Sequence, residues 1–252
     1  MLLLISLIFV MSLLLGSFLN VCIHRIPRKE SIAHPPSHCP KCDTKLKFID
    51  LLPVISYLST KGKCRYCGER ISPQYPIIEL LTAIISILIY LNYGLSILFV
   101  KYVVLSMILI VVSVIDYKYQ IIPNKIIIFG FIVGISLHLL YNVRTSFING
   151  TIGLLIGGGI FLLIAIVTKG AMGGGDIKLM GMIGFYLGYK SILLVTFLSF
   201  IIGAFISILL LVTKIKSRKD FIPFGPFISI ATIIVVLYGK DLVGLYLKLI
   251  LN

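Results

Sequence analysis

Long apolar runs, each close to the length that crosses a lipid bilayer, recur along most of this 252-residue chain. A transmembrane helix needs about 20 consecutive, mostly apolar residues. The chain is 59% hydrophobic, with a mean hydropathy of +1.10, which excludes an ordinary soluble domain. The runs are continuous rather than alternating, so they indicate helices and not the strands of a β-barrel. We therefore predict an all-α polytopic membrane protein.

About eight transmembrane helices fit the pattern, with a polar segment from Arg25 to about Pro76 after the first. The first run lacks the basic start and small-residue cleavage site of a signal peptide, so we expect it to be a retained helix. The polar motif "YGKD" at 238–241 interrupts the last apolar run, which is counted as one span. The predicted spans are about 2–23, 77–92, 96–115, 126–141, 149–168, 177–189, 190–213 and 224–250.

Some glycines of the apolar runs stand four residues apart. This small-xxx-small spacing lets membrane helices pack closely. Glycine is also common in membrane helices generally, so the spacing alone leaves both interpretations open. The pairs are Gly130/Gly134, Gly153/Gly157 and Gly184/Gly188.

The formal net charge is +14, and two explanations are open. Basic patches can bind nucleic acid, whereas excess Lys and Arg in a membrane protein mark the cytoplasmic loops. If the N-terminus lies outside, the inside loops hold 18 of the 23 Lys and Arg, ten of them between Arg25 and Arg70. This bias follows the positive-inside rule. We therefore expect membrane lipid, and no nucleic acid, around this protein.

The polar segment carries two C-x-x-C pairs, Cys39/Cys42 and Cys64/Cys67, separated by 21 residues. Four thiolates can bind one zinc ion tetrahedrally, and such a site is structural because no position stays open. Two disulfides or four free thiols are the alternatives, although structural disulfides are rare in the cytoplasm. His38, next to the first pair, is an alternative ligand. The pattern predicts a cytoplasmic zinc-binding loop after the first helix.

Three of the nine Asp and Glu, namely Glu79, Asp116 and Asp176, stand at the ends of apolar runs. Acids within a membrane are costly and face a protein interior or a wet cavity, which makes them functional candidates. In the topology above, Asp116 and Asp176 both lie at cytoplasmic helix ends. Two carboxylates in a low-dielectric site tend to share a proton. The ionised one can deprotonate a water while the protonated one polarises a carbonyl, as in aspartic proteases.

Gly173, Gly174 and Gly175 directly precede Asp176. Residues without side chains let a substrate backbone approach Asp176 and permit an extended or left-handed turn. The alternatives are that Asp176 caps the helix beginning after it, or that Asp116 pairs with Lys118 or Lys178. A proton or ion relay is a further alternative for the two acids together.

The sequence resembles the bacterial type IV prepilin peptidases, which are bifunctional leader peptidases and N-methyltransferases of the GxGD intramembrane aspartic protease family. The resemblance covers nearly the whole chain and implies that Asp116 and Asp176 are the two catalytic aspartates. The motifs that carry it are "GSFLNVCIHRIPR" at 16–28, the paired C-x-x-C loop, "CRYCGERISPQYPIIELLT" at 64–82, "IDYKYQIIPN" at 115–124, "GGGD" at 173–176 and "FIPFGPFI" at 221–228.

The resemblance implies an enzyme that cleaves the short basic leader of type IV prepilins and pseudopilins after glycine, on the cytoplasmic side. It also implies methylation of the new N-terminal residue with S-adenosylmethionine, and a multi-pass protein of the bacterial inner membrane. A peptidase without methyltransferase activity and an ion-coupled transporter using the same acids are the alternatives.

The two activities are expected in different parts of the chain. Residues 1–92 would hold the first helix and the four-cysteine module with the methyltransferase, and residues 93–252 the peptidase. Glu79 is the candidate for orienting the substrate amine or contacting the cofactor. The alternative is a glutamate stabilised by the dipole at a helix N-terminus.

Overall fold

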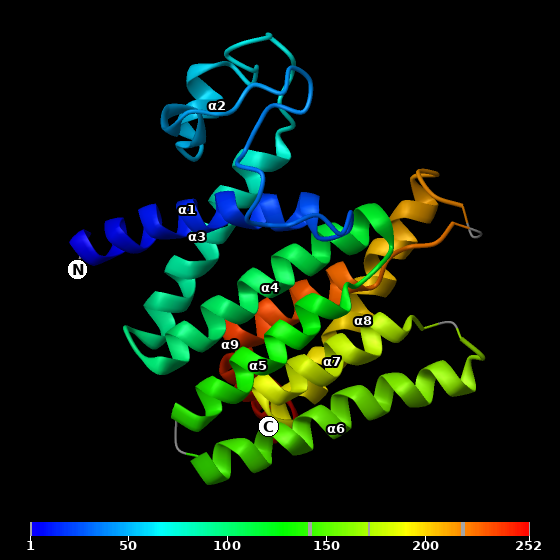
Figure 1. Ribbon diagram of the computed structural model, residues 1–252. Helices are drawn as coiled ribbons and strands as arrows, with labels where there is room; N and C mark the ends of the chain where they lie inside the picture. Colours follow the sequence, from blue (N-terminus) through cyan, green and yellow to red (C-terminus); the bar gives the residue numbers. More distant parts are fainter. Residues whose placement is uncertain (1, 141–142, 171, 218–219, 252) are drawn as a thin grey trace. The chain divides into compact units, whose positions relative to one another are not determined.

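The computed structural model describes residues 2–140, 143–170, 172–217 and 220–251. Within these residues the regular structure is helical apart from two isolated β-bridges, which confirms the all-α prediction. The chain divides into two compact units, Met1–Gly94 and Leu95–Asn252 (Figure 1). Sequence reasoning put the division two residues earlier, after residue 92.

The N-terminal unit pairs two long helices that flank the cysteine-bearing segment in sequence. They approach closely because Gly16 has no side chain: a Cβ there would lie 2.7 Å from the Cα of Glu79. Asn20 Nδ2 also donates a hydrogen bond to the carbonyl of Tyr75 at 3.1 Å. The helices of this unit are α1 (Leu2–Arg25), η1 (Phe48–Leu51), α2 (Ile55–Ser59) and α3 (Gln74–Tyr93).

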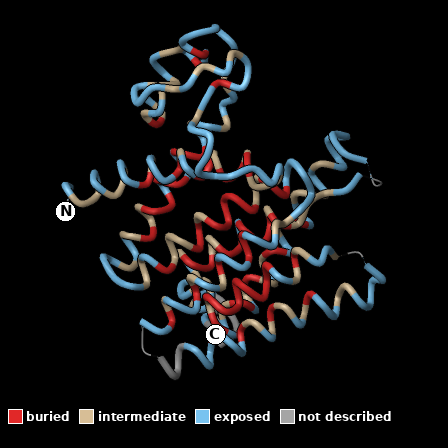
Figure 2. The backbone as a smooth tube through the Cα atoms, viewed as in Figure 1, coloured by how far each residue is buried: buried red, intermediate tan, exposed pale blue. Residues whose placement is uncertain are grey.

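The C-terminal unit packs around α7, in which every residue from Leu179 to Tyr186 is buried. Buried residues also run along the second half of α4, as Figure 2 shows. Helix α9 contacts both α4 and α8, and Ser229 Oγ donates to the carbonyl of Leu109 at 3.3 Å. The helices are α4 (Ile97–Tyr119), α5 (Asn124–Leu140), α6 (Val143–Val167), α7 (Gly174–Leu187), α8 (Tyr189–Val212) and α9 (Gly225–Leu251).

Glycines bring α6 and α7 into direct backbone contact. A Cβ on Gly153 would overlap the carbonyl oxygen of Gly184, and one on Gly157 would lie 2.6 Å from the carbonyl oxygen of Met180. On the other side of α7, a Cβ on Gly134 would lie 2.7 Å from the ring of Tyr186. The glycines at four-residue spacing therefore mark close helix contacts, as small residues do in membrane proteins.

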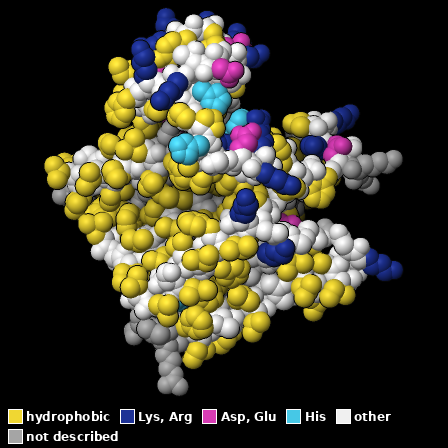
Figure 3. Space-filling view, viewed as in Figure 1, with side chains coloured by type: hydrophobic (Ala, Val, Ile, Leu, Met, Phe, Trp, Pro, Cys, Tyr) yellow, Lys and Arg dark blue, Asp and Glu magenta, His cyan; other side chains and the backbone are white. Residues whose placement is uncertain are grey.

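In the described part of the chain, six helices are long and apolar enough to cross a membrane: α1, α3, α4, α6, α8 and α9. Helix α5 is apolar but shorter, with 17 residues, and α7 has 14. Large hydrophobic side chains stand exposed on the helices of the C-terminal unit, for example Phe205 at 70% and Val212 at 74%. Figure 3 shows how much of the visible surface is hydrophobic. Lipid tails would cover such faces. The chain is therefore a multi-pass membrane protein.

The polar motif at 238–241 interrupts the apolar run but not the helix, because α9 continues from Gly225 to Leu251. An interior glycine costs a helix only about 1 kcal/mol, which packing along the rest of the helix offsets. Lys240 and Asp241 are both exposed, so neither charge has to be buried in continuing the helix.

Candidate active site

Asp116 and Asp176 lie buried at two helix ends of the C-terminal unit. Asp116 stands in the last turn of α4 and Asp176 in the first turn of α7, with exposed fractions of 6% and 8%. The two carboxylates interact electrostatically, and neither forms an ion pair within the described residues. Lys178, an alternative partner for Asp116, donates instead to Asn124 Oδ1 at 3.0 Å. Two acids far apart in sequence thus share one buried environment.

The start of α9 holds Asp116 in place. Gly225 donates its backbone N–H to Asp116 Oδ2 at 2.9 Å. Phe224, just before it, packs edge-to-face on Phe227 and tilted against Phe161, which fixes this segment. A helix N-terminus carries partial positive charge, so it stabilises a negatively charged oxygen. Sequence reasoning identified 221–228 only as a family motif and missed this contact.

Asp176 is incompletely hydrogen bonded. Its Oδ1 is fully buried and has no hydrogen-bond partner within the described residues, while its carboxylate interacts with the backbone of Gly173. Helix α7 has Gly173 as its N-cap and Asp176 as its third residue, so the interpretation of Asp176 as the cap is wrong. An unpartnered buried polar atom costs about 1–3 kcal/mol. Oδ1 therefore marks a position for a proton, a water or a substrate group.

The three glycines before Asp176 have different surroundings. A Cβ on Gly175 would lie 2.8 Å from the Cβ of Ile122, in the segment that follows Asp116. An added Cβ on Gly174 would have nothing within 4 Å. Gly173 is extended, with φ −68° and ψ 140°, so no left-handed turn is needed there. Gly175 thus lets the two aspartate segments touch, and Gly174 is the one that leaves open space beside them.

The Gly225 contact predicts a specific loss of cleavage. A Cβ at this position would lie 2.6 Å from Asp116 Oδ2, so Gly225→Ala must displace the carboxylate. A displacement of about 1 Å costs on the order of 100-fold in rate, and we expect that loss in leader cleavage with the helical content unchanged. Gly244→Ala, in the same helix and with nothing within 4 Å of the added Cβ, is the matched control. Equal rates for the two variants would contradict the positioning role.

The four cysteines of the C-x-x-C pairs gather in the N-terminal unit. Their sulfur atoms all lie within 4.8 Å of one another, and Cys39 Sγ is 3.9 Å from Cys67 Sγ. Four thiolates around one zinc ion, with Zn–S bonds of about 2.3 Å, would be about 3.8 Å apart. The cysteines are free thiols, so the disulfide alternative is not what the structure contains. His38 lies outside this cluster and directs Nδ1 to the carbonyl of Pro36.

The same local turn presents each cysteine pair. The backbone N–H of Cys39 donates to the carbonyl of Thr44, and that of Cys64 donates to the carbonyl of Glu69. Hydrogen bonding with Thr44 lowers the pKa of the Cys42 thiol to about 7. The backbone N–H groups of Cys67 and Tyr66 lower the pKa of the Cys64 thiol. Both shifts favour thiolate, the form that binds metal, whereas burial and the neighbouring thiols raise the pKa of Cys67. The gathering of the four sulfur atoms is what fits a zinc ion.

Glu79 lies in the sixth position of α3, beyond the first turn, and is buried with an exposed fraction of 5%. The dipole of a helix N-terminus acts within the first turn, so that explanation of Glu79 is wrong. Instead, its Oε2 accepts the backbone N–H of Val54 at 2.8 Å, which connects α3 to the cysteine-bearing segment. Glu79 also lines a cavity of about 570 Å³ within the N-terminal unit.

Two family models match the chain. The bacterial peptidase A24 N-terminal domain matches residues 10–93, and the type IV leader peptidase family matches residues 103–208. The first match lies within the unit that holds the cysteine cluster, and the second within the unit that holds Asp116 and Asp176. No solved structure matches the chain significantly.

Curated relatives match the chain from end to end. A Bacillus subtilis (strain 168) protein named prepilin leader peptidase/N-methyltransferase is 37% identical over 98% of this chain and 99% of its own length. A protein of the same name from Pseudomonas putida is 30% identical over 98% of this chain and 94% of its own length. Another from Xanthomonas campestris is 32% identical over 94% of this chain and 92% of its own length. The chain therefore belongs to the type IV leader peptidase family, among its bacterial prepilin leader peptidase/N-methyltransferases.

Proposed function

We propose that this protein cleaves the short basic leader of type IV prepilins and pseudopilins after its last glycine, and N-methylates the residue that becomes the new N-terminus. The buried pair Asp116 and Asp176 carries the proposal for cleavage, since both acids share one environment without a neutralising cation among the described residues. The names of the relatives support the substrate class and favour an enzyme over an ion-coupled transporter.

We assign different roles to the two aspartates. The Gly225 N–H bond to Asp116 Oδ2 suits an ionised acceptor, so Asp116 is the base. The unpartnered Oδ1 of Asp176 suits a carboxyl that carries the shared proton and donates it to the scissile carbonyl oxygen. Asp116 takes a proton from water, and the resulting hydroxide attacks the glycine carbonyl carbon. When the tetrahedral intermediate collapses, the C–N bond breaks and the leaving amine takes the proton that Asp116 removed from water. A hydroxyl proton of the intermediate returns to Asp176 as the new carboxyl group forms, which restores the shared proton.

The two halves of the chain divide the two activities, with the methyltransferase in residues 1–92 and the peptidase in 93–252. The methyl donor that the methyltransferase requires is S-adenosylmethionine. Cys39, Cys42, Cys64 and Cys67 hold a structural zinc ion, which their sulfur separations support. The charge distribution, with 18 of 23 Lys and Arg in loops on one side, supports an N-terminus outside the bacterial inner membrane and an active site facing the cytoplasm.

The product masses test this function directly. Purified protein in detergent is incubated with a prepilin, with and without S-adenosylmethionine. We expect loss of the leader in both reactions, and the added mass of one CH₂ group only when the methyl donor is present. Absence of cleavage by folded protein against several prepilins would contradict the peptidase assignment. Cleavage without the mass gain would leave a peptidase alone.

A further inference from the structure

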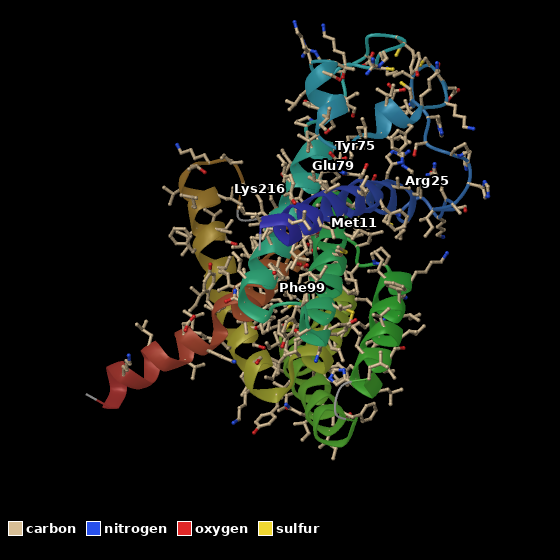
Figure 4. The ribbon with its side chains drawn as sticks, turned by 90° about the vertical axis from the view of Figure 1, so that its left-hand side faces the viewer. Met11, Arg25, Tyr75, Glu79, Phe99 and Lys216 are labelled. Carbon is tan, nitrogen blue, oxygen red and sulfur yellow. The ribbon has the colours of Figure 1, made fainter. Side chains whose placement is uncertain are left out.

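The N-terminal unit contains a cavity whose lining does not include Asp116 or Asp176. It has a volume of about 570 Å³ and lies between α1, the cysteine-bearing segment and the start of α3. A volume of about 300–1,000 Å³ is typical of sites for small molecules and cofactors. Figure 4 shows two of its lining residues, Tyr75 and Glu79, near the start of α3. Other residues of its wall include Ser17 and Asn20 from α1, and Asp50 and Tyr57 from the segment between the helices.

The charges around this cavity suit a ligand that carries both signs. Five of the nine acidic residues of the chain line it, although the chain as a whole is strongly basic. Within the described residues, the one ion pair among the lining side chains joins Asp50 to Arg65. The buried Arg25 of the wall donates to the carbonyls of Ser31 and Pro35 rather than to an acid. The other carboxylates therefore remain available to a cationic ligand, and basic side chains on the same wall to its carboxylate.

Glu79 is the buried acid of this wall. Its Oε2 accepts the N–H of Val54, and Ser17 also hydrogen-bonds the carboxylate, so its position is fixed. Tyr75 lies one helical turn before it and lines the same cavity. Residues four apart share a helix face, which places an aromatic ring and a carboxylate together. Both groups attract a cation, the ring through its electron-rich face.

We propose that this cavity is the methyl-transfer site, in which Glu79 balances the positive charge of a sulfonium methyl donor and Tyr75 contacts the donor. The inference rests on the methyltransferase activity proposed above and adds its location and its charge-bearing residue. The donor class is an adenosyl sulfonium amino acid, which combines an aromatic base, a sulfonium and a zwitterionic amino acid end. Aromatic side chains of the lining can contact the base, the carboxylate of Glu79 can balance the sulfonium, and the acidic and basic side chains together can bind the zwitterionic end.

Methyl transfer from the sulfonium to the new N-terminal amine needs no further reactant. The new N-terminal ammonium first loses a proton to water or to a carboxylate of the wall. The neutral amine then attacks the methyl carbon, the C–S bond breaks, and its electron pair stays on sulfur as a neutral thioether. The product is a secondary ammonium, so the positive charge moves from sulfur to nitrogen. A fixed carboxylate at Glu79 keeps that charge within the site during the transfer.

A tryptophan reporter tests the location. The chain has no tryptophan, so Tyr75→Trp places the sole one on the cavity wall. Titration of this variant with S-adenosylmethionine is expected to change its fluorescence saturably, whereas Phe99→Trp in the C-terminal unit should not respond. Equilibrium binding of radiolabelled S-adenosylmethionine to the tryptophan-free wild type gives the reference affinity. A silent Tyr75→Trp that still binds the labelled donor would overturn the location, and so would a response to a basic leader peptide but not to the donor.

Glu79→Gln tests the charge. The amide oxygen can still accept the N–H of Val54, so the variant removes the charge and keeps the hydrogen bond. We expect the affinity for S-adenosylmethionine to fall about tenfold, with less than about a twofold change for S-adenosylhomocysteine, whose sulfur is neutral. Asp241→Asn, an exposed acid of α9, is the matched control and should change neither affinity. Equal losses for both ligands would indicate a purely structural role for Glu79.

Two further readouts separate this inference from the function on which it rests. Zinc content and leader cleavage in Glu79→Gln report whether the chain still folds, and both are expected to match the wild type. If wild-type protein methylates a processed pilin while Glu79→Gln binds the donor normally, only the inference on Glu79 fails. If wild-type protein neither methylates nor binds the donor, the methyltransferase function fails and the site fails with it.

Discussion

Replacing either Asp116 or Asp176 with asparagine is expected to lower the rate of leader cleavage by about 10³-fold to 10⁴-fold. Asparagine has nearly the same shape but cannot take up or release the shared proton. In Asp116→Asn the amide cannot deprotonate the attacking water. In Asp176→Asn the group that polarises the scissile carbonyl is lost, although the amide can still interact with the backbone of Gly173.

The measurement is the initial rate of leader loss, followed by mass spectrometry with a prepilin in detergent. Asp241→Asn is the control, because it makes the same chemical change at an exposed position of α9. Both dyad variants should keep their zinc content and bind S-adenosylmethionine as the wild type does, since the cavity and the cysteines belong to the other unit. Cleavage at more than a tenth of the wild-type rate in either variant would contradict the catalytic role of the two aspartates.

The second large effect is expected at the cysteine cluster. Cys39→Ser/Cys42→Ser removes two of four thiolates, so zinc should fall from about one ion per chain to nearly none. Cys39 and Cys64 also line the cavity, and loss of the metal frees the turns that carry them. We therefore expect methylation of a processed pilin to fall at least about 100-fold, because a displacement of about 1 Å at a reacting site has that cost.

Cleavage in the same variant should fall less than tenfold, since Asp116, Asp176 and Gly225 all lie in the C-terminal unit. Elemental analysis gives the zinc content, and the mass assay gives both activities. Cys22→Ala is the control: Cys22 is the fifth cysteine, buried in α1 and absent from the cluster. Parallel loss of cleavage and methylation would show that the module supports folding of the whole chain and not methylation in particular.

The sequence was sufficient to predict every long helix, because hydropathy is a local property. A run that must bury about 20 residues in lipid has few alternatives to a helix. The cysteine cluster was also predictable, because the C-x-x-C spacing places two thiols in one turn. The fold then only has to bring two such turns together. The polar motif at 238–241 does not end α9, because packing along this helix outweighs the local cost of Gly239, Lys240 and Asp241.

The sequence by itself determined the helical membrane architecture and the acids and thiols that can do chemistry. Only the tertiary structure decided their partners: the N–H of Gly225 for Asp116, 109 residues away, and the N–H of Val54 for Glu79. The physical reason is that nearly every residue has the same backbone N–H donor. Residue type therefore does not show which N–H group will bind a given carboxylate. The packing of Gly175 on Ile122 and the unpartnered Oδ1 of Asp176 likewise arise only when separate helix ends come together.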